Sequence, residues 1–147
     1  MCPDAVLLSA PLQTAIPPRE MSGLQLAFIG DCVFELLVRG SVLETDTGNV
    51  RQLHRHAVAY ANAAFQARAA VMLEPFFNEE ELAVYRRGRN AHTTHTPKNK
   101  SEAQYHRATG LEAVFGYLYL CGAKERLQTL FRLIQETVKE EEKHEKK

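Results

Sequence analysis

Two carboxylates stand out in this sequence, because each interrupts an apolar stretch of helical spacing and has glycines close by. Asp31 directly follows Gly30, and Glu112 lies between Gly110 and Gly116. Burying an ionised carboxylate is costly unless a cation compensates for it, and a glycine inside a helix costs about 1 kcal/mol relative to alanine. A carboxylate within an apolar helix and a glycine nearby are both unfavourable, and their occurrence together at two places indicates a functional site or a point of close packing.

The chemistry that these carboxylates could share depends on a metal ion. If their helices cross with the glycines in contact, Asp31 and Glu112 converge, and converging carboxylates favour a divalent cation between them. Hard oxygen ligands point to magnesium. Glu35, four residues after Asp31, can share its helix face. For each acid taken alone, pairing with a core cation or exposure to solvent stays an open alternative.

The elements that must position these residues are helices, because no window alternates with period two over a convincing length. Helical spacing predicts helices over about 24–39, 50–73, 79–87 and 101–121, and a last helix from 123 onward. Loops are predicted at 41–48 and at 88–100, the second polar and basic. The residues that signal where these helices begin or end are Ser22, Gly40, Pro75, the pair Asn78 and Glu81, Ser101 and Gly122.

Length and composition indicate a single all-α domain. The chain has 147 residues, of which 45% are hydrophobic, enough for one domain with its own core. We expect a proline-rich arm at 1–20, the domain at 21–135 and a charged tail at 136–147. Charged residues interrupt the longest apolar runs, so no membrane span is expected, and the N-terminus lacks the basic start of a secretory signal. Three scattered cysteines are typical of free thiols in a reducing cytoplasm.

The charge distribution matters more than the net charge. A net charge of zero argues by itself against a nucleic-acid partner. Within residues 86–107, however, Glu102 is the only acid against six arginines and lysines: Arg86, Arg87, Arg89, Lys98, Lys100 and Arg107. A locally basic face is what a polyanion requires, because phosphate contacts act locally. An ordinary solvated face remains the alternative interpretation of the charges alone.

Two segments resemble the motifs of the ribonuclease III family. The segment Leu26-Ala27-Phe28-Ile29-Gly30-Asp31 resembles the family's signature helix, and Leu111-Glu112-Ala113-Val114-Phe115-Gly116 resembles its second motif. Their order and separation match as well. Residues 52–55, 86–90 and 97–99 are similar to the small, single-domain Mini-ribonuclease III group in particular. The resemblance extends over about 24–135, and it implies that no double-stranded-RNA-binding domain of the kind found in the larger enzymes is to be expected, as in that group.

The chain departs from the larger enzymes at three positions. They have a glutamate where this chain has Ala27, an aspartate where it has Thr109, and an acid near Gln52. The Mini group shares this reduced set, which leaves Asp31 and Glu112 as the carboxylates. Thr109 is expected to contribute only weakly, through its hydroxyl or a bound water.

The resemblance implies an endoribonuclease that cleaves double-stranded RNA and matures a large-subunit ribosomal RNA precursor in the cytoplasm. It implies that Asp31 and Glu112 are catalytic and hold Mg²⁺, which would activate water and stabilise the leaving oxygen. It also implies a homodimeric helical bundle packed through the signature helix, with Phe34 as a first guess for an interface position. The residues expected to hold the RNA backbone are Arg87, Arg89, Asn90, Lys98 and Lys100.

Two alternatives from other functional classes stay open. One is a non-catalytic RNA-binding relative with the same fold, which the retention of both Asp31 and Glu112 argues against. The other is a helical protein-interaction module, which the basic stretch after Gly88 argues against. A cleavage assay on a long RNA duplex, with and without magnesium, separates the three.

Overall fold

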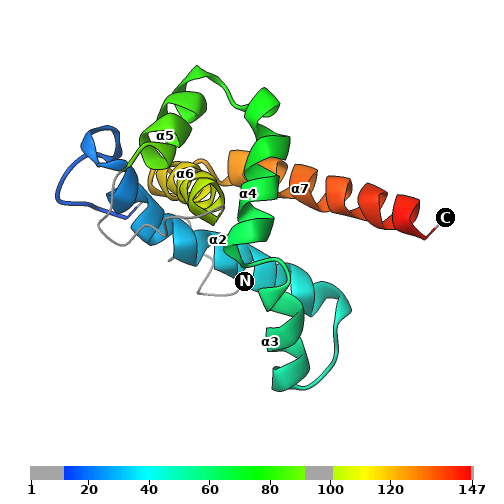
Figure 1. The fold of residues 1–147 in the computed structure, drawn as a ribbon. Coiled ribbons are helices and arrows are strands. Elements are labelled where there is room, and N and C mark those ends of the chain that lie inside the picture. The colour runs from blue at the N-terminus through cyan, green and yellow to red at the C-terminus, as the bar shows by residue number, and fades with distance from the viewer. Residues whose placement is uncertain (1–11, 92–100, 147) are drawn as a thin grey trace.

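The computed structural model describes residues 12–91 and 101–146, and within them every regular element is a helix. The all-α prediction is therefore confirmed. Figure 1 shows α6 in the centre of the molecule, α3 at the far end of α2, and α7 extending away from the body. In chain order the elements are η1 (Pro18–Glu20), α2 (Gly23–Thr45), α3 (Val50–Val58), α4 (Ala63–Leu73), η2 (Glu74–Phe76), α5 (Glu79–Arg89), α6 (Ser101–Leu120) and α7 (Lys124–Glu145).

Helix α6 is the core of the fold, with α2, α4 and α5 packed around it. In its second half every residue except Glu112 and Tyr119 is buried, as expected of a helix surrounded by others, and Leu111 and Val114 have no exposed surface. Phe34 of α2 packs against Phe115 of α6 and Phe131 of α7, with ring centroids 5.3 Å and 6.1 Å apart. These aromatic contacts join three helices into one core.

Two helix starts confirm the capping signals predicted at Ser22 and Asn78, while Ser101, predicted as a cap, is the first residue of α6. Ser22 and Asn78 each accept a hydrogen bond from the backbone N–H three residues on, and the side chains of Gln25 and Glu81 accept from the cap backbone in return. These reciprocal bonds satisfy N–H groups that the first turn of a helix leaves without partners. At the other end of α6, Gly122 adopts a φ of 74°, which ends the helix as predicted.

Two predicted boundaries are wrong. Helix α2 does not end at Gly40 but continues to Thr45, because Val38 and Val42 on either side are buried and outweigh the cost of one exposed glycine. The predicted helix over 50–73 is two helices. Asn62 accepts a hydrogen bond from the Phe65 N–H and so begins α4 separately.

Two further helices run longer than expected. Helix α5 includes Gly88 and Arg89, which the sequence assigned to a loop. Helix α7 is continuous to Glu145, and ion pairing supports its distal half, since Arg68 of α4 lies 2.6 Å from Glu141. In the described residues, no helix combines the length and apolar character needed to cross a membrane.

Candidate active site

Helices α2 and α6 cross with their backbones in contact at Gly30 and Gly116. A Cβ added to Gly30 would overlap the carbonyl oxygen of Glu112, and one added to Gly116 would overlap the carbonyl oxygen of Leu26. Each glycine therefore allows the other helix to pass at a distance that no larger residue permits. The glycine contact anticipated from the sequence is confirmed, and it brings Asp31 beside Glu112.

The two carboxyl groups interact across this crossing. Burial, followed by the charge of Asp31 and a hydrogen bond between the two side chains, raises the pKa of Glu112 to about 8. Two carboxylates that face each other cannot both ionise cheaply, so the pair either shares a proton or takes up a cation. Hard oxygen donors are the ligands that Mg²⁺ prefers, and Mg²⁺ commonly takes only one or two carboxylates from a protein. The donor set therefore fits such an ion.

The expectation that Asp31 is buried is wrong. Asp31 is exposed and Glu112 is partly buried. The apolar neighbours that suggested burial lie on other faces of α2, because adjacent helix residues point about 100° apart. An exposed Asp31 beside a partly buried Glu112 leaves one side of the pair open, where a large substrate can approach.

The other polar residues considered for the site are engaged elsewhere. Glu35 accepts two hydrogen bonds from Arg39, at 3.0 Å and 2.6 Å. The Thr109 hydroxyl donates to the Tyr105 carbonyl of its own helix at 2.9 Å, and the Gln52 side chain accepts from the Asn49 N–H at the start of α3. None of these side chains adds an oxygen ligand to the pair in this arrangement.

A second close contact brings the C-terminal end of α5 against α6. A Cβ on Gly88 would lie 2.8 Å from the Cβ of Ala113 and 2.9 Å from the Cα of Gly110. Gly110 and Ala113 flank Glu112 in sequence, so α5 ends within about one helical turn of the site. The contact between Gly88 and Gly110 could not be predicted from the sequence, because a glycine carries no sign of which helix it contacts.

The predicted RNA-binding residues divide into three groups. Arg87 is exposed and donates to the Arg19 carbonyl at 2.9 Å. Arg89 is partly buried with its guanidinium 5.6 Å from the centre of the Tyr85 ring, while Asn90 is exposed at the end of α5. Lys98 and Lys100 lie outside the described residues. The three described residues thus stand at the end of α5 that contacts α6 next to Glu112.

The exposed face of α2 carries large apolar side chains beside the Glu35–Arg39 ion pair. Phe28 is 82% exposed, and Leu36 and Leu43 are also exposed on the same side of the helix. Phe34, the first guess for an interface position, has no exposed surface and belongs to the core, so that guess is wrong. The helical spacing of Phe28, Leu36 and Leu43 is visible in the sequence and places them on one side of the helix. Because α2 has apolar residues on both sides, the sequence does not show which side faces the core.

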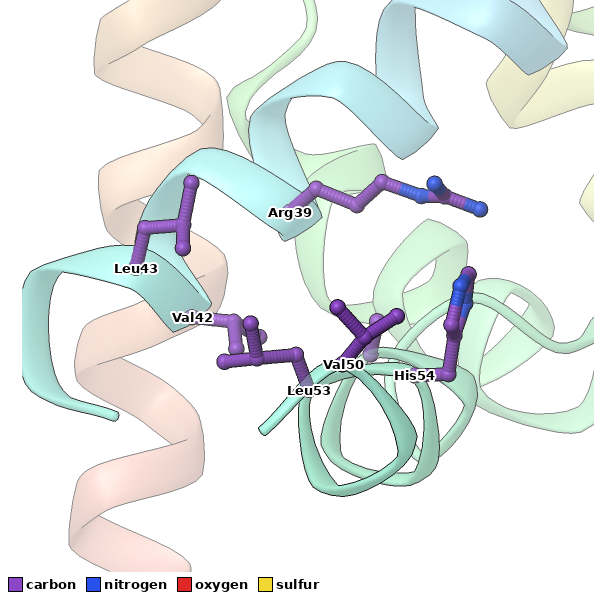
Figure 2. Close-up of a pocket in the computed structure, with 7 residues that line it drawn as sticks. Arg39, Val42, Leu43, Val50, Leu53 and His54 are labelled. Carbon is purple, nitrogen blue, oxygen red and sulfur yellow. The ribbon is translucent and has the colours of Figure 1, made fainter. Parts of the chain in front are cut away.

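An apolar groove of about 190 Å³ continues this face between the C-terminal half of α2 and α3. Figure 2 shows Arg39 and His54 together at one end of the groove and Leu43 at the other. The groove is lined by Arg39, Val42, Leu43, Val50, Leu53, His54 and Ala57.

An all-helical core in which two glycine-flanked motifs meet to pair one aspartate with one glutamate defines a ribonuclease III-type endonuclease domain. The family model described as Ribonuclease III domain matches residues 24–123. The chain therefore belongs to the ribonuclease III family, and it is an endoribonuclease.

Its relatives agree with this assignment. The chain is 43% identical to a Mini-ribonuclease 3 of Symbiobacterium thermophilum over 115 residues, which cover 78% of this chain and 88% of that one. It is 41% identical to a Mini-ribonuclease 3 of Desulfitobacterium hafniense, covering 84% of this chain and 78% of the other. A crystal structure of a Fusobacterium nucleatum protein is similar in fold, with a TM-score of 0.71, 31% identity, and coverage of 84% and 96%.

Proposed function

We propose that this protein hydrolyses double-stranded RNA with a divalent cation, Mg²⁺, held by Asp31 and Glu112. The observation that carries the proposal is the pairing of these two side chains at the α2–α6 crossing, where burial together with the charge of Asp31 raises the pKa of Glu112 to about 8. A bound Mg²⁺ would supply charge for the scissile phosphate and acidify a water molecule. Glu112 would lose its proton on binding the cation, and the exposed Asp31 would face the RNA backbone.

The substrate proposed is a duplex held by its backbone. Duplex RNA is recognised largely through phosphates and 2′-hydroxyls, not through base edges. The cationic end of α5, with Arg87, Arg89 and Asn90, stands one helical turn from Glu112. Lys98 and Lys100 continue this basic stretch in the sequence. We assign these five residues to the RNA-binding surface of a catalytic domain at 21–135.

The protein is proposed to act as a homodimer formed through α2. An exposed apolar face of this kind on a soluble protein marks an interaction surface, and in a two-fold dimer each residue pair is repeated in reverse. Phe28 stands near one end of the face and the apolar groove lies at the other. An antiparallel pairing of two α2 helices would therefore insert Phe28 of each copy into the groove of its partner. Such a dimer carries two active sites, one for each RNA strand.

The natural substrate proposed is a precursor of the large-subunit ribosomal RNA in the cytoplasm. Support for this comes from the resemblance to the Mini group and from the relatives named Mini-ribonuclease 3. The ribosomal precursor is a narrower claim than cleavage of duplex RNA. If this precursor proves not to be the substrate, the proposal that the protein cleaves duplex RNA still stands.

A cleavage assay tests the proposed function. The parental protein should cut a long RNA duplex with Mg²⁺ and not with a chelator. Asp31→Asn should abolish cleavage while leaving folding and dimerisation unchanged, and Glu112→Gln should act alike, because the two residues form one unit. Glu35→Gln is the matched control, since it removes a carboxylate one turn away and should retain cleavage. An Asp31→Asn protein that cleaves at the parental rate would overturn the assignment and favour a non-catalytic role for the carboxylate pair.

A further inference from the structure

Helix α3 presents a cationic face that the proposed active site does not use. Arg51, His54 and Arg55 are exposed, and residues 50–58 contain no acid. Within residues 12–91 and 101–146, none of these three side chains makes an ion pair or a side-chain hydrogen bond. By contrast, Arg39, Arg68 and Arg126 each pair with a glutamate. A helix face of unpaired cations is suited to a polyanion.

Helix α3 packs on the C-terminal half of α2, away from Asp31 of its own chain. Helix α3 packs on α2 around Arg39, Val42 and Leu43, where the groove lies. Eight residues separate Asp31 from Arg39, which is about 12 Å along the helix axis. Arg39, which lines the groove together with His54 of α3, therefore stands about two helical turns from Asp31 of its own chain.

The dimer proposed above brings the same face close to the other active site. Phe28 and Asp31 are three residues apart, about 4.5 Å along α2. If Phe28 of one copy occupies the groove of the second copy, its Asp31 lies beside that groove's rim. His54 forms this rim together with Arg39 (Figure 2). Arg51 and Arg55 lie on the adjoining outer face of α3, three residues before and one after His54.

We propose that α3 of each protomer contributes Arg51, His54 and Arg55 to the RNA-binding surface of its partner's active site. These side chains would contact backbone phosphates next to the bond that the partner's Asp31 and Glu112 address. Each catalytic site would then be complete only in the dimer. The inference rests on the proposed function, because it assigns further binding residues to that same site.

Two heterodimers that carry the same substitutions in different arrangements test this pairing. In the first, one chain has Asp31→Asn and the other has Arg51→Ala with Arg55→Ala. In the second, all three substitutions are on one chain and the other chain is parental. Co-expression with two affinity tags allows each heterodimer to be purified, and nicking of a duplex is measured below saturation.

The proposal expects the first heterodimer to be the active one. Its one intact Asp31 faces an intact α3, so it should nick at about half the parental rate, because one of two symmetric sites is complete. In the second heterodimer the intact Asp31 faces a substituted α3, and nicking should be about tenfold slower or more at moderate salt. If α3 serves its own chain, the order reverses. Reversed or equal rates overturn the inference.

Controls separate this inference from the proposed function. A homodimer with Arg51→Ala and Arg55→Ala should melt at the parental temperature and lose duplex affinity. A homodimer with Arg68→Ala and Arg132→Ala loses the same charge away from α3 and should bind almost as the parental protein does. An active Asp31→Asn homodimer would overturn the proposed function and this inference together. An inactive one, combined with equal heterodimer rates, would overturn this inference alone.

Discussion

Gly30 of α2 and Gly116 of α6 pack against each other's helix backbone, and this contact holds Asp31 beside Glu112. The contact is a steric one between two helix backbones, and the position of the carboxylate pair depends on it. The geometry of the carboxylate pair depends on two residues that have no side chain, so changes at the glycines should affect folding and activity together.

Adding one methyl group at the crossing should therefore be severe. Gly30→Ala or Gly116→Ala places a Cβ inside a backbone carbonyl, which cannot move aside as a flexible side chain can. We expect each to lower the free energy of unfolding by about 3 kcal/mol or more and to abolish cleavage. Gly40→Ala is the control, because its Cβ would meet nothing within 4 Å. It should raise the free energy of unfolding by about 0.5–1 kcal/mol. Urea denaturation measures all three, and equal effects at Gly30 and Gly40 would contradict the close crossing.

The stability of the metal-free protein should fall as the pH rises. The pKa of Glu112 is about 8 in the folded protein, above its ordinary value of 4.5. The folded state therefore binds more protons between these two values. Its stabilising contribution is fully present below pH 4.5 and is lost as the pH rises through 8.

Thermal melts with a chelator at pH 6 and pH 9 test this titration. Glu112→Gln should melt several degrees above the parental protein at pH 9, since about 1 kcal/mol corresponds to 2–4 °C for a chain of this size, and less so at pH 6. Added Mg²⁺ should stabilise the parental protein more at pH 9 than at pH 6, and should have little effect on the variant. Parallel melting curves for the two proteins would argue against the shifted pKa.

Charged substitutions at two phenylalanines of α2 should have different outcomes. Phe28 is 82% exposed, so Phe28→Asp should give a folded monomer that has lost double-strand cleavage. Phe34 is fully buried between Phe115 and Phe131, so Phe34→Asp should prevent folding. Phe76→Asp, at another exposed phenylalanine, should leave the dimer intact. Light scattering and circular dichroism on the same samples distinguish these results, and a folded Phe28→Asp dimer would exclude this interface.

The cationic stretch that begins in the last turn of α5 should set the salt dependence of RNA binding. Replacing Arg87, Arg89 and Lys98 with alanine removes three positive charges per chain, so binding should weaken for every duplex sequence alike. The slope of log affinity against log salt should become shallower. Filter binding in a chelator, which prevents cleavage, gives that slope. An unchanged slope in the triple variant would place the electrostatic contacts elsewhere on the molecule.

Much of the fold follows from local signals in the sequence. Ser22 and Asn78 begin helices because their side chains bond to N–H groups only three residues away, and Gly122 ends one because it can adopt positive φ. Asp31 and Glu112 were identifiable as a pair because each adds a charge to an apolar helix beside glycines. These are properties of short segments, so neighbours in sequence are sufficient to predict them.

Other features depend on which surfaces the helices bury, and only the tertiary structure decides these. Helix α2 has apolar residues on both sides, so the exposed position of Phe28 and the buried position of Phe34 follow from where α6 and α7 pack. The same packing continues α2 past Gly40 and leaves Asp31 exposed. It also leaves Arg51 and Arg55 exposed on α3. Burial is a relation between segments far apart in the chain, and residue spacing within one helix does not determine it.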